Sequence, residues 1–152
     1  ELVAASRAAV GLMHMQGEPR TMQQNPHYAD VVGEVAAFLA ERVAAAEAAG
    51  IALNRIAVDP GFGFGKTLEH NVELLRHQRA FTDLGYPLLI GVSRKALIGI
   101  MTGRPARERV VGSAVAAAFA VQAGAAIIRA HDVAATVDAV KVAVALRSRE
   151  AK

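Results

Sequence analysis

Four short runs of apolar and β-branched residues, each followed by a helical pattern, limit the possible fold of this 152-residue sequence most strongly. The runs are Val10–Met15, Ile56–Asp59, Pro87–Ser93 and Ala126–His131. They are apolar throughout instead of alternating, which is typical of strands that helices cover on both faces. Their ends recur at intervals of about 35 to 45 residues, which predicts strand–loop–helix units and a parallel sheet. The pattern therefore predicts an α/β fold.

The segments between these runs carry apolar residues at helical spacing. Gly50 and Gly85 follow two of the predicted helices, where glycine commonly ends a helix, and Asp132 is expected to cap the last one. The repeat fits half of a (βα)8 barrel or a short doubly wound sheet, and periodicity alone does not separate the two. The predicted helices are Tyr28–Ala49, Leu68–Leu84, Lys95–Met101, Arg107–Ala123 and Asp132 to about Arg147.

Composition excludes several classes of protein. The chain has no cysteine, so a disulfide framework, a zinc–thiolate site and an iron–sulfur cluster are excluded, and a cytoplasmic location is expected. The net charge of +3 is small and the basic residues are scattered, which argues against nucleic-acid binding. The apolar stretch Val110–Ile128 is long enough to cross a membrane, but Gly124 divides it, and a buried helix followed by a buried strand is expected instead.

Asp59 ends a predicted strand and begins a glycine-rich loop that runs to Thr67. The loop is not a P-loop, because Pro60 stands where that motif needs glycine, and its glycines also miss the dinucleotide-binding spacing. A carboxylate followed by a loop with Phe62 and Phe64 suits a planar heterocycle that donates paired hydrogen bonds. The alternative is that Asp59 caps the next turn and both phenylalanines belong to the core.

Cationic side chains follow the third and fourth predicted strands. Lys95 lies in the first turn of a helix, where the helix dipole disfavours a cation, so it is either solvated or held for a ligand. Strand alternation puts Arg129 and His131 on one face ahead of a helix, which predicts an oxyanion or phosphate site; a surface ion pair and a backbone-bonded histidine are the alternatives. Arg94 is expected to point outward, and Asp132 is expected to be only a helix cap.

The first predicted strand closes on the segment Met13–Gly17. Methionines at a strand end are usually core residues, and His14 between them is expected to point the opposite way. No second histidine or carboxylate has ligand spacing nearby, so no metal site is predicted there. Because the carboxyl ends of parallel strands form the site edge of α/β proteins, the polar residues at the four ends predict one binding site.

Four segments, in this order and at these separations, closely resemble the C-terminal half of the bacterial dihydropteroate synthase family: Met13–Gly17, Asp59–Lys66, Ser93–Lys95 and Arg129–Asp132. The resemblance covers essentially the whole chain. It implies a (βα)8 TIM barrel, of which residues 1–152 supply about four C-terminal βα units as a single domain. It also implies an enzyme that joins 6-hydroxymethyl-7,8-dihydropterin diphosphate to p-aminobenzoate, giving 7,8-dihydropteroate and diphosphate.

The resemblance implies a role for each candidate site residue. Asp59 and Lys95 are the implied catalytic residues: Asp59 would accept hydrogen bonds from the pterin amino and ring N–H groups, and Lys95 would bond the ring oxygen and nitrogen. Arg129 and His131 would hold the diphosphate, where negative charge grows as the C–O bond breaks. Met13 would line the pterin pocket, Phe64 and Ser93 would border the p-aminobenzoate site with Lys95, and Gly91 and Ala130 complete the implied substrate-binding set.

The resemblance further implies Mg2+ on the diphosphate, with its ligand in the missing N-terminal half and none in this chain, and a homodimer formed through residues 107–147. Ala96 stands where relatives often carry serine. Without the N-terminal half, the 152 residues are expected to have no synthase activity. The alternatives are a methyltetrahydrofolate-type pterin-binding methyltransferase, a non-catalytic pterin-binding half-barrel and a flavodoxin-like module, which needs a reversal of strand order.

Overall fold

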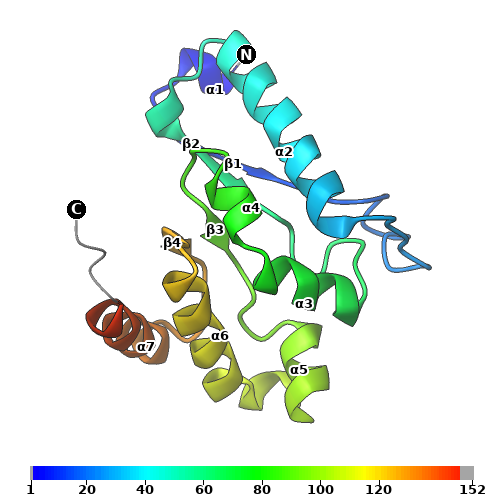
Figure 1. The fold of residues 1–152 in the computed structure, drawn as a ribbon, viewed down its shortest axis with the longest axis vertical. Helices are drawn as coiled ribbons and strands as arrows, with labels where there is room; N and C mark the ends of the chain where they lie inside the picture. Colours follow the sequence, from blue (N-terminus) through cyan, green and yellow to red (C-terminus); the bar gives the residue numbers. More distant parts are fainter. Residues whose placement is uncertain (1, 148–152) are drawn as a thin grey trace.

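Strands and helices alternate along the chain in the computed structural model, which describes residues 2–147 (Figure 1). The strands are β1 (Val10–Met13), β2 (Ile56–Asp59), β3 (Leu89–Ile90) and β4 (Ile127–Ile128). The helices are α1 (Leu2–Ala5), α2 (Val31–Ala48), α3 (Leu68–Arg76), α4 (Arg79–Thr82), α5 (Ala96–Thr102), α6 (Val110–Gln122) and α7 (Val133–Leu146), with 3-10 turns at Leu53–Arg55 and Ala106–Glu108.

The strands follow one another in sequence order. β1 pairs in parallel with β2, and β3 pairs in parallel with β4. A parallel bridge between Val58 and Leu88 joins the two pairs, so the order is β1-β2-β3-β4 without a reversal. The α/β prediction is confirmed, and the flavodoxin-like alternative is excluded because its strand order would have to reverse.

Helix α2 shows how the sequence sets one layer of the fold. The Asp30 carboxylate accepts hydrogen bonds from the backbone N–H groups of Val32 and Gly33, at 3.2 and 3.1 Å, and so caps the helix. Apolar residues four positions apart then form one buried stripe, which packs against the sheet as an amphipathic helix should. The buried residues of the stripe are Val31, Val35, Leu39 and Val43.

The predicted helix Leu68–Leu84 is two helices, α3 and α4. The His77 ring nitrogen Nδ1 lies 3.0 Å from the Glu73 carbonyl oxygen, and the Gln78 side-chain amide donates to the Leu75 carbonyl at 2.9 Å. These side chains occupy carbonyls at the end of α3, so the helix stops there instead of continuing. The prediction of one helix was wrong because apolar spacing does not register such competition.

The predicted helix Arg107–Ala123 begins later, at Val110, because Ala106–Glu108 forms a 3-10 turn after Pro105. The apolar runs predicted that both faces of every strand are covered. This prediction holds for β2 but not for the end strands, since Ile127 of β4 is 41% exposed. The stretch Val110–Ile128 is the helix α6 followed by β4, as predicted, but neither is fully buried: Val111 is 76% exposed. The prediction of burial was wrong because one face of α6 has no covering element within residues 2–147. No helix within residues 2–147 is long and apolar enough to span a membrane.

Candidate functional site

Asp59 is buried at the carboxyl end of β2, and its carboxylate accepts a hydrogen bond from the Gly61 backbone N–H at 2.8 Å. Burial raises the pKa of Asp59, whereas that hydrogen bond and the charges of Lys95, Arg129 and Lys66 act to lower it. Asp59 therefore also caps the turn that follows β2, which was the alternative role considered for it. The carboxylate lies within electrostatic range of three cationic side chains.

The loop after β2 packs closely against the loop after β1. Gly61 and Gly65 have φ values of +72° and +66°, in the left-handed region that favours glycine. A Cβ atom at Gly61 would lie 1.8 Å from the His14 carbonyl oxygen, and one at Gly65 would lie 2.4 Å from the Gln16 carbonyl oxygen. Glycine is therefore required at both positions to bring the two strand ends together.

The two phenylalanines of this loop have different roles. Phe62 is completely buried, so the expectation that it offers a flat face to a ligand was wrong. Phe64 is half-buried, and the Lys95 ammonium lies 4.5 Å from the centre of its ring, a cation–π distance. Lys95 also donates a hydrogen bond to the Phe62 carbonyl, and burial lowers the Lys95 pKa to about 8. Lys95 is therefore held by the loop and is not a freely solvated lysine.

A cavity of about 470 Å³ lies between the loop after β1, the loop after β2 and the start of α5. Two predicted site residues, Phe64 and Lys95, line it, and so does Ala96, which brings no hydroxyl group. Aromatic, apolar and cationic groups together suit a small aromatic anion. Other predicted residues do not line this cavity: Met13, Asp59, Gly91, Ser93, Arg129, Ala130 and His131.

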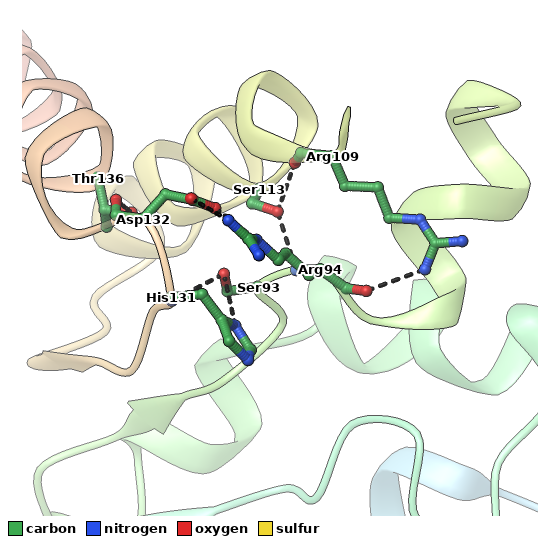
Figure 2. A network of polar contacts seen from close by, with 7 residues as sticks. All are labelled: Ser93, Arg94, Arg109, Ser113, His131, Asp132 and Thr136. Carbon is green, nitrogen blue, oxygen red and sulfur yellow. Dashed lines mark hydrogen bonds and ion pairs between the residues drawn. The ribbon is translucent and has the colours of Figure 1, made fainter. Parts of the chain in front are cut away.

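The Arg129 backbone N–H donates to the Ile90 carbonyl at 3.0 Å, and side-chain contacts also join the ends of β3 and β4. A Cβ atom at Gly91 would lie 3.2 Å from Arg129 Nε, so the guanidinium rests directly against this glycine. Two residues further along each segment, the Ser93 hydroxyl accepts a hydrogen bond from the His131 backbone N–H at 3.1 Å and lies 3.2 Å from the ring nitrogen Nδ1 (Figure 2). Arg129 and His131 thus both face the end of β3, with Ala130 between them.

Met13 lies beside the loop after β2, at the carboxyl ends of the strands. Its Cγ atom would lie 3.4 Å from a Cβ atom placed at Gly61. His14 is buried, with its ring edge-on to Phe38 at 4.9 Å between ring centres. The first strand therefore ends with Met13 beside the Asp59 loop and with His14 against helix α2.

Lys66 is a further candidate site residue that sequence reasoning missed. It is only 2% exposed, lines the cavity, and places its ammonium 3.0 Å from the Phe64 carbonyl oxygen and 2.9 Å from His14 Nδ1. Burial lowers the Lys66 pKa to about 8, and burial together with the Lys66 charge lowers the His14 pKa to about 4. In sequence, Lys66 stood only at the end of the segment Asp59–Lys66 and received no role, and its burial depends on loop packing that no spacing reveals.

Arg94 and Asp132 form an ion pair, contrary to both sequence predictions (Figure 2). Arg94 was expected to point outward, but its Nε donates to Asp132 Oδ2 at 2.9 Å and its Nη2 donates to Oδ1. Asp132 precedes α7 without making a side-chain capping bond, because the guanidinium occupies both carboxylate oxygens. The pair links the loop after β3 to the loop after β4.

Residues 2–147 contain no group of three or more His, Cys, Asp or Glu side chains that could hold a metal ion. The residues described therefore do not form an Mg2+ site by themselves. Ligands for Mg2+ from an N-terminal half stay a prediction.

The chain matches the pterin binding enzyme family over residues 1–131. It is 56% identical over 142 residues to the dihydropteroate synthase of Neisseria meningitidis serogroup C, a match that covers 92% of this chain and 50% of that protein. Its fold matches the Yersinia pestis dihydropteroate synthase solved with a sulfonamide drug, with a TM-score of 0.90 and 44% identity over 93% of this chain and 52% of the other.

It also matches the Xanthomonas albilineans dihydropteroate synthase solved with 7,8-dihydropteroate, with a TM-score of 0.88 and 50% identity over 96% of this chain and 55% of the other. The chain thus spans about half the length of the relatives it matches. The prediction that it supplies part of a (βα)8 barrel is confirmed by this likeness. Together with the buried carboxylate and its surrounding cations, the match over residues 1–131 shows that the chain belongs to the pterin binding enzyme family.

Proposed function

We propose that this chain is the C-terminal half of a dihydropteroate synthase, a transferase that joins 6-hydroxymethyl-7,8-dihydropterin diphosphate to p-aminobenzoate. The observation that carries the proposal is the buried Asp59 carboxylate, with Lys95 and Arg129 in electrostatic range. A pterin presents an amino group and a ring N–H side by side, and a carboxylate accepts two such donors in parallel. The cations suit a diphosphate attached to the same substrate.

Asp59 and Lys95 are the proposed catalytic residues. Asp59 accepts the pterin hydrogen bonds in a site of low dielectric, where they are stronger than in water. An ammonium group has three N–H donors, so Lys95 keeps two for the pterin ring oxygen and nitrogen besides its bond to the Phe62 carbonyl. Met13, which lies beside the Asp59 loop, provides an apolar contact for the ring.

The reaction separates charge, and the proposed residues act on both parts. The bond between the pterin methylene carbon and the diphosphate oxygen breaks, and its electron pair leaves with the diphosphate. Arg129 and His131 hold the growing negative charge, while the Asp59 carboxylate stabilises the cationic pterin. The aniline nitrogen of p-aminobenzoate then bonds to the methylene carbon and loses a proton.

The aniline substrate is assigned to the cavity of about 470 Å³ that Phe64 and Lys95 line. The Phe64 ring offers a flat face, and the Lys95 ammonium lies above it. Ser93 is assigned to the border of the same substrate, although it does not line the cavity itself, and Gly91 and Ala130 complete the substrate-binding set at the ends of β3 and β4. Arg129 with His131 favours this reaction over the methyltransferase alternative, because only the synthase has a diphosphate to hold.

The proposal includes Mg2+ bound through an N-terminal half, a cytoplasmic location, no nucleic-acid partner and a homodimer. The dimer interface is placed within residues 107–147, where α6 and α7 expose large apolar side chains: Val111, Val115, Phe119, Val133, Val137, Val142, Val144 and Leu146. An exposed set of this kind on adjacent helices is typical of a protein interface. Sedimentation at several concentrations tests the dimer.

A hybrid protein tests the proposed activity. It joins this chain to the half of the Neisseria meningitidis serogroup C relative that the chain does not match. The hybrid is expected to form dihydropteroate from the two substrates, whereas the 152-residue chain alone is expected to form none. A folded hybrid without activity, or turnover by the isolated chain, would contradict the proposal; dihydropterin binding without turnover would favour the non-catalytic alternative.

A further inference from the structure

Arg94 adopts a backbone conformation that a residue with a side chain rarely takes. Its φ is +57°, in the left-handed region, which is costly for any residue with a Cβ atom. Such a conformation persists only where the surroundings determine it strongly, and it is common at functional sites. Arg94 lies between Ser93 and Lys95, two residues to which the proposed function gives substrate contacts.

Two hydrogen bonds hold the Arg94 backbone in this conformation, and two further contacts support their partners (Figure 2). The Arg94 N–H donates to the Ser113 hydroxyl at 3.0 Å, and its carbonyl accepts from Arg109 Nη1 at 2.9 Å. The same Nη1 lies 3.2 Å from the Lys95 carbonyl oxygen, and the Ser113 hydroxyl donates to the Arg109 carbonyl at 2.6 Å. The turn is thus fixed from the start of α6.

The left-handed turn separates the directions of neighbouring side chains. Ser93 reaches His131 and Lys95 reaches the Phe62 carbonyl, whereas Arg94 reaches Asp132. Two links therefore join the same two loops: Ser93 with His131, and Arg94 with Asp132 directly beside them. The Asp132 side chain is 18% exposed and that of Arg94 is 36% exposed, so this pair is shielded more than the surface ion pairs.

We propose that Arg94 and Asp132 are positioning residues, whose ion pair fixes the orientation of Lys95 and His131 toward the reacting groups without itself touching substrate. The inference rests on the proposed function, because it concerns how that site is held. A bidentate guanidinium–carboxylate pair sets both distance and direction, so a lysine or an amide substituted for either partner keeps only part of the constraint.

The test uses the hybrid protein with the variants Arg94→Met, Asp132→Asn and Arg94→Lys. A misplacement of about 1 Å costs about 100-fold in rate, so Arg94→Met and Asp132→Asn are expected to lower kcat about 100-fold. KM for p-aminobenzoate should change less than about threefold, because no substrate contact is removed. Arg94→Lys should recover part of kcat. The double variant Arg94→Met/Asp132→Asn should be about as slow as either single variant, because both remove the same link.

The matched control is a second Arg–Asp pair, Arg79 with Asp83, whose side chains are 87% and 64% exposed. Arg79→Met and Asp83→Asn should leave kcat unchanged. Loss through KM in Arg94→Met would overturn the proposal, since it would make Arg94 a substrate ligand. Unchanged kcat in both Arg94→Met and Asp132→Asn would overturn it as well.

Hydrogen exchange separates this inference from the proposed function. The His131 amide donates to Ser93, and the Val58 amide donates to the Pro87 carbonyl within the sheet. In Asp132→Asn, His131 exchange should accelerate about tenfold, whereas Val58 exchange, which reports global folding, should not change. If the unsubstituted hybrid is inactive, the proposed function fails, and exchange still decides whether the pair holds the loop; unchanged His131 exchange would contradict the positioning role.

Discussion

Gly61→Ala is expected to destabilise the protein far more than Gly85→Ala, although both residues have left-handed backbones with φ of +72° and +83°. The added Cβ at Gly85 meets no atom within 4 Å, so only backbone strain of about 1 kcal/mol is incurred. At Gly61 it would lie 1.8 Å from the His14 carbonyl oxygen, and overpacking costs about 1 to 3 kcal/mol more. Separating the loops also threatens the 3.0 Å hydrogen bond from the His14 N–H to the Asp59 carbonyl, worth about 1 kcal/mol.

The two variants should therefore differ by about 3 kcal/mol in the free energy of unfolding. Urea unfolding of the hybrid protein, followed by circular dichroism, measures this difference, and Gly85→Ala serves as the control for backbone strain. A shared m-value is needed for the comparison, because a changed m-value indicates a change in the unfolded ensemble. Equal costs for the two substitutions would refute the reasoning that close loop packing, and not φ alone, requires glycine at position 61.

Three further changes have defined outcomes. Lys95→Met should lower kcat of the hybrid about 100- to 1,000-fold in steady-state assays, as loss of one charge-stabilising donor does, without lowering its Tm, because a buried charge is removed. Leu39→Ala, at a fully buried position, should cost about 3 kcal/mol in urea unfolding, against less than about 0.5 kcal/mol for Leu53→Ala, which is 60% exposed. The His14 pKa falls from 6.5 to about 4 on folding, so the unfolded state binds more protons between these values and stability should rise by up to about 3 kcal/mol from pH 4 to 6.5. In His14→Gln this rise should be reduced, and the same slope in both proteins would contradict the assignment.

Parallel strand–helix units and the position of the site edge could be predicted from the sequence, because both follow from features that repeat along the chain, whereas the strand order could not be predicted from that repeat. Apolar runs at regular separation predict parallel pairing, and Asp59 and His131 are each the last residue of such a run. The same reasoning located Lys95 at that edge. It did not reveal how the side chain is held, since contact with Phe64 depends on the path of a loop from another unit.

The errors arose where side chains from separate units compete for the same partner. Asp132 has the residue type and position of a helix cap, yet a guanidinium from the preceding unit takes its carboxylate. Lys66 resembles an ordinary loop lysine, yet the close approach of two loops buries it against His14. Both outcomes depend on tertiary contacts between residues that are 38 and 52 positions apart, which local propensity does not contain.

The charge balance of the site explains why a buried carboxylate and two buried lysines can coexist. Burial is the largest cause that lowers the pKa values of Lys66 and Lys95, a neighbouring cation lowers each further, and the Asp59 carboxylate acts in the opposite direction, so that both pKa values lie at about 8. Asp59 supplies one negative charge to three cations, which leaves an excess of positive charge at the end of the sheet. An anionic diphosphate bound there would favour the protonated lysines, and the protonated lysines would favour the anion, by the same coupling free energy. The site is therefore electrostatically incomplete without an anion, which is the property that a diphosphate-releasing enzyme needs.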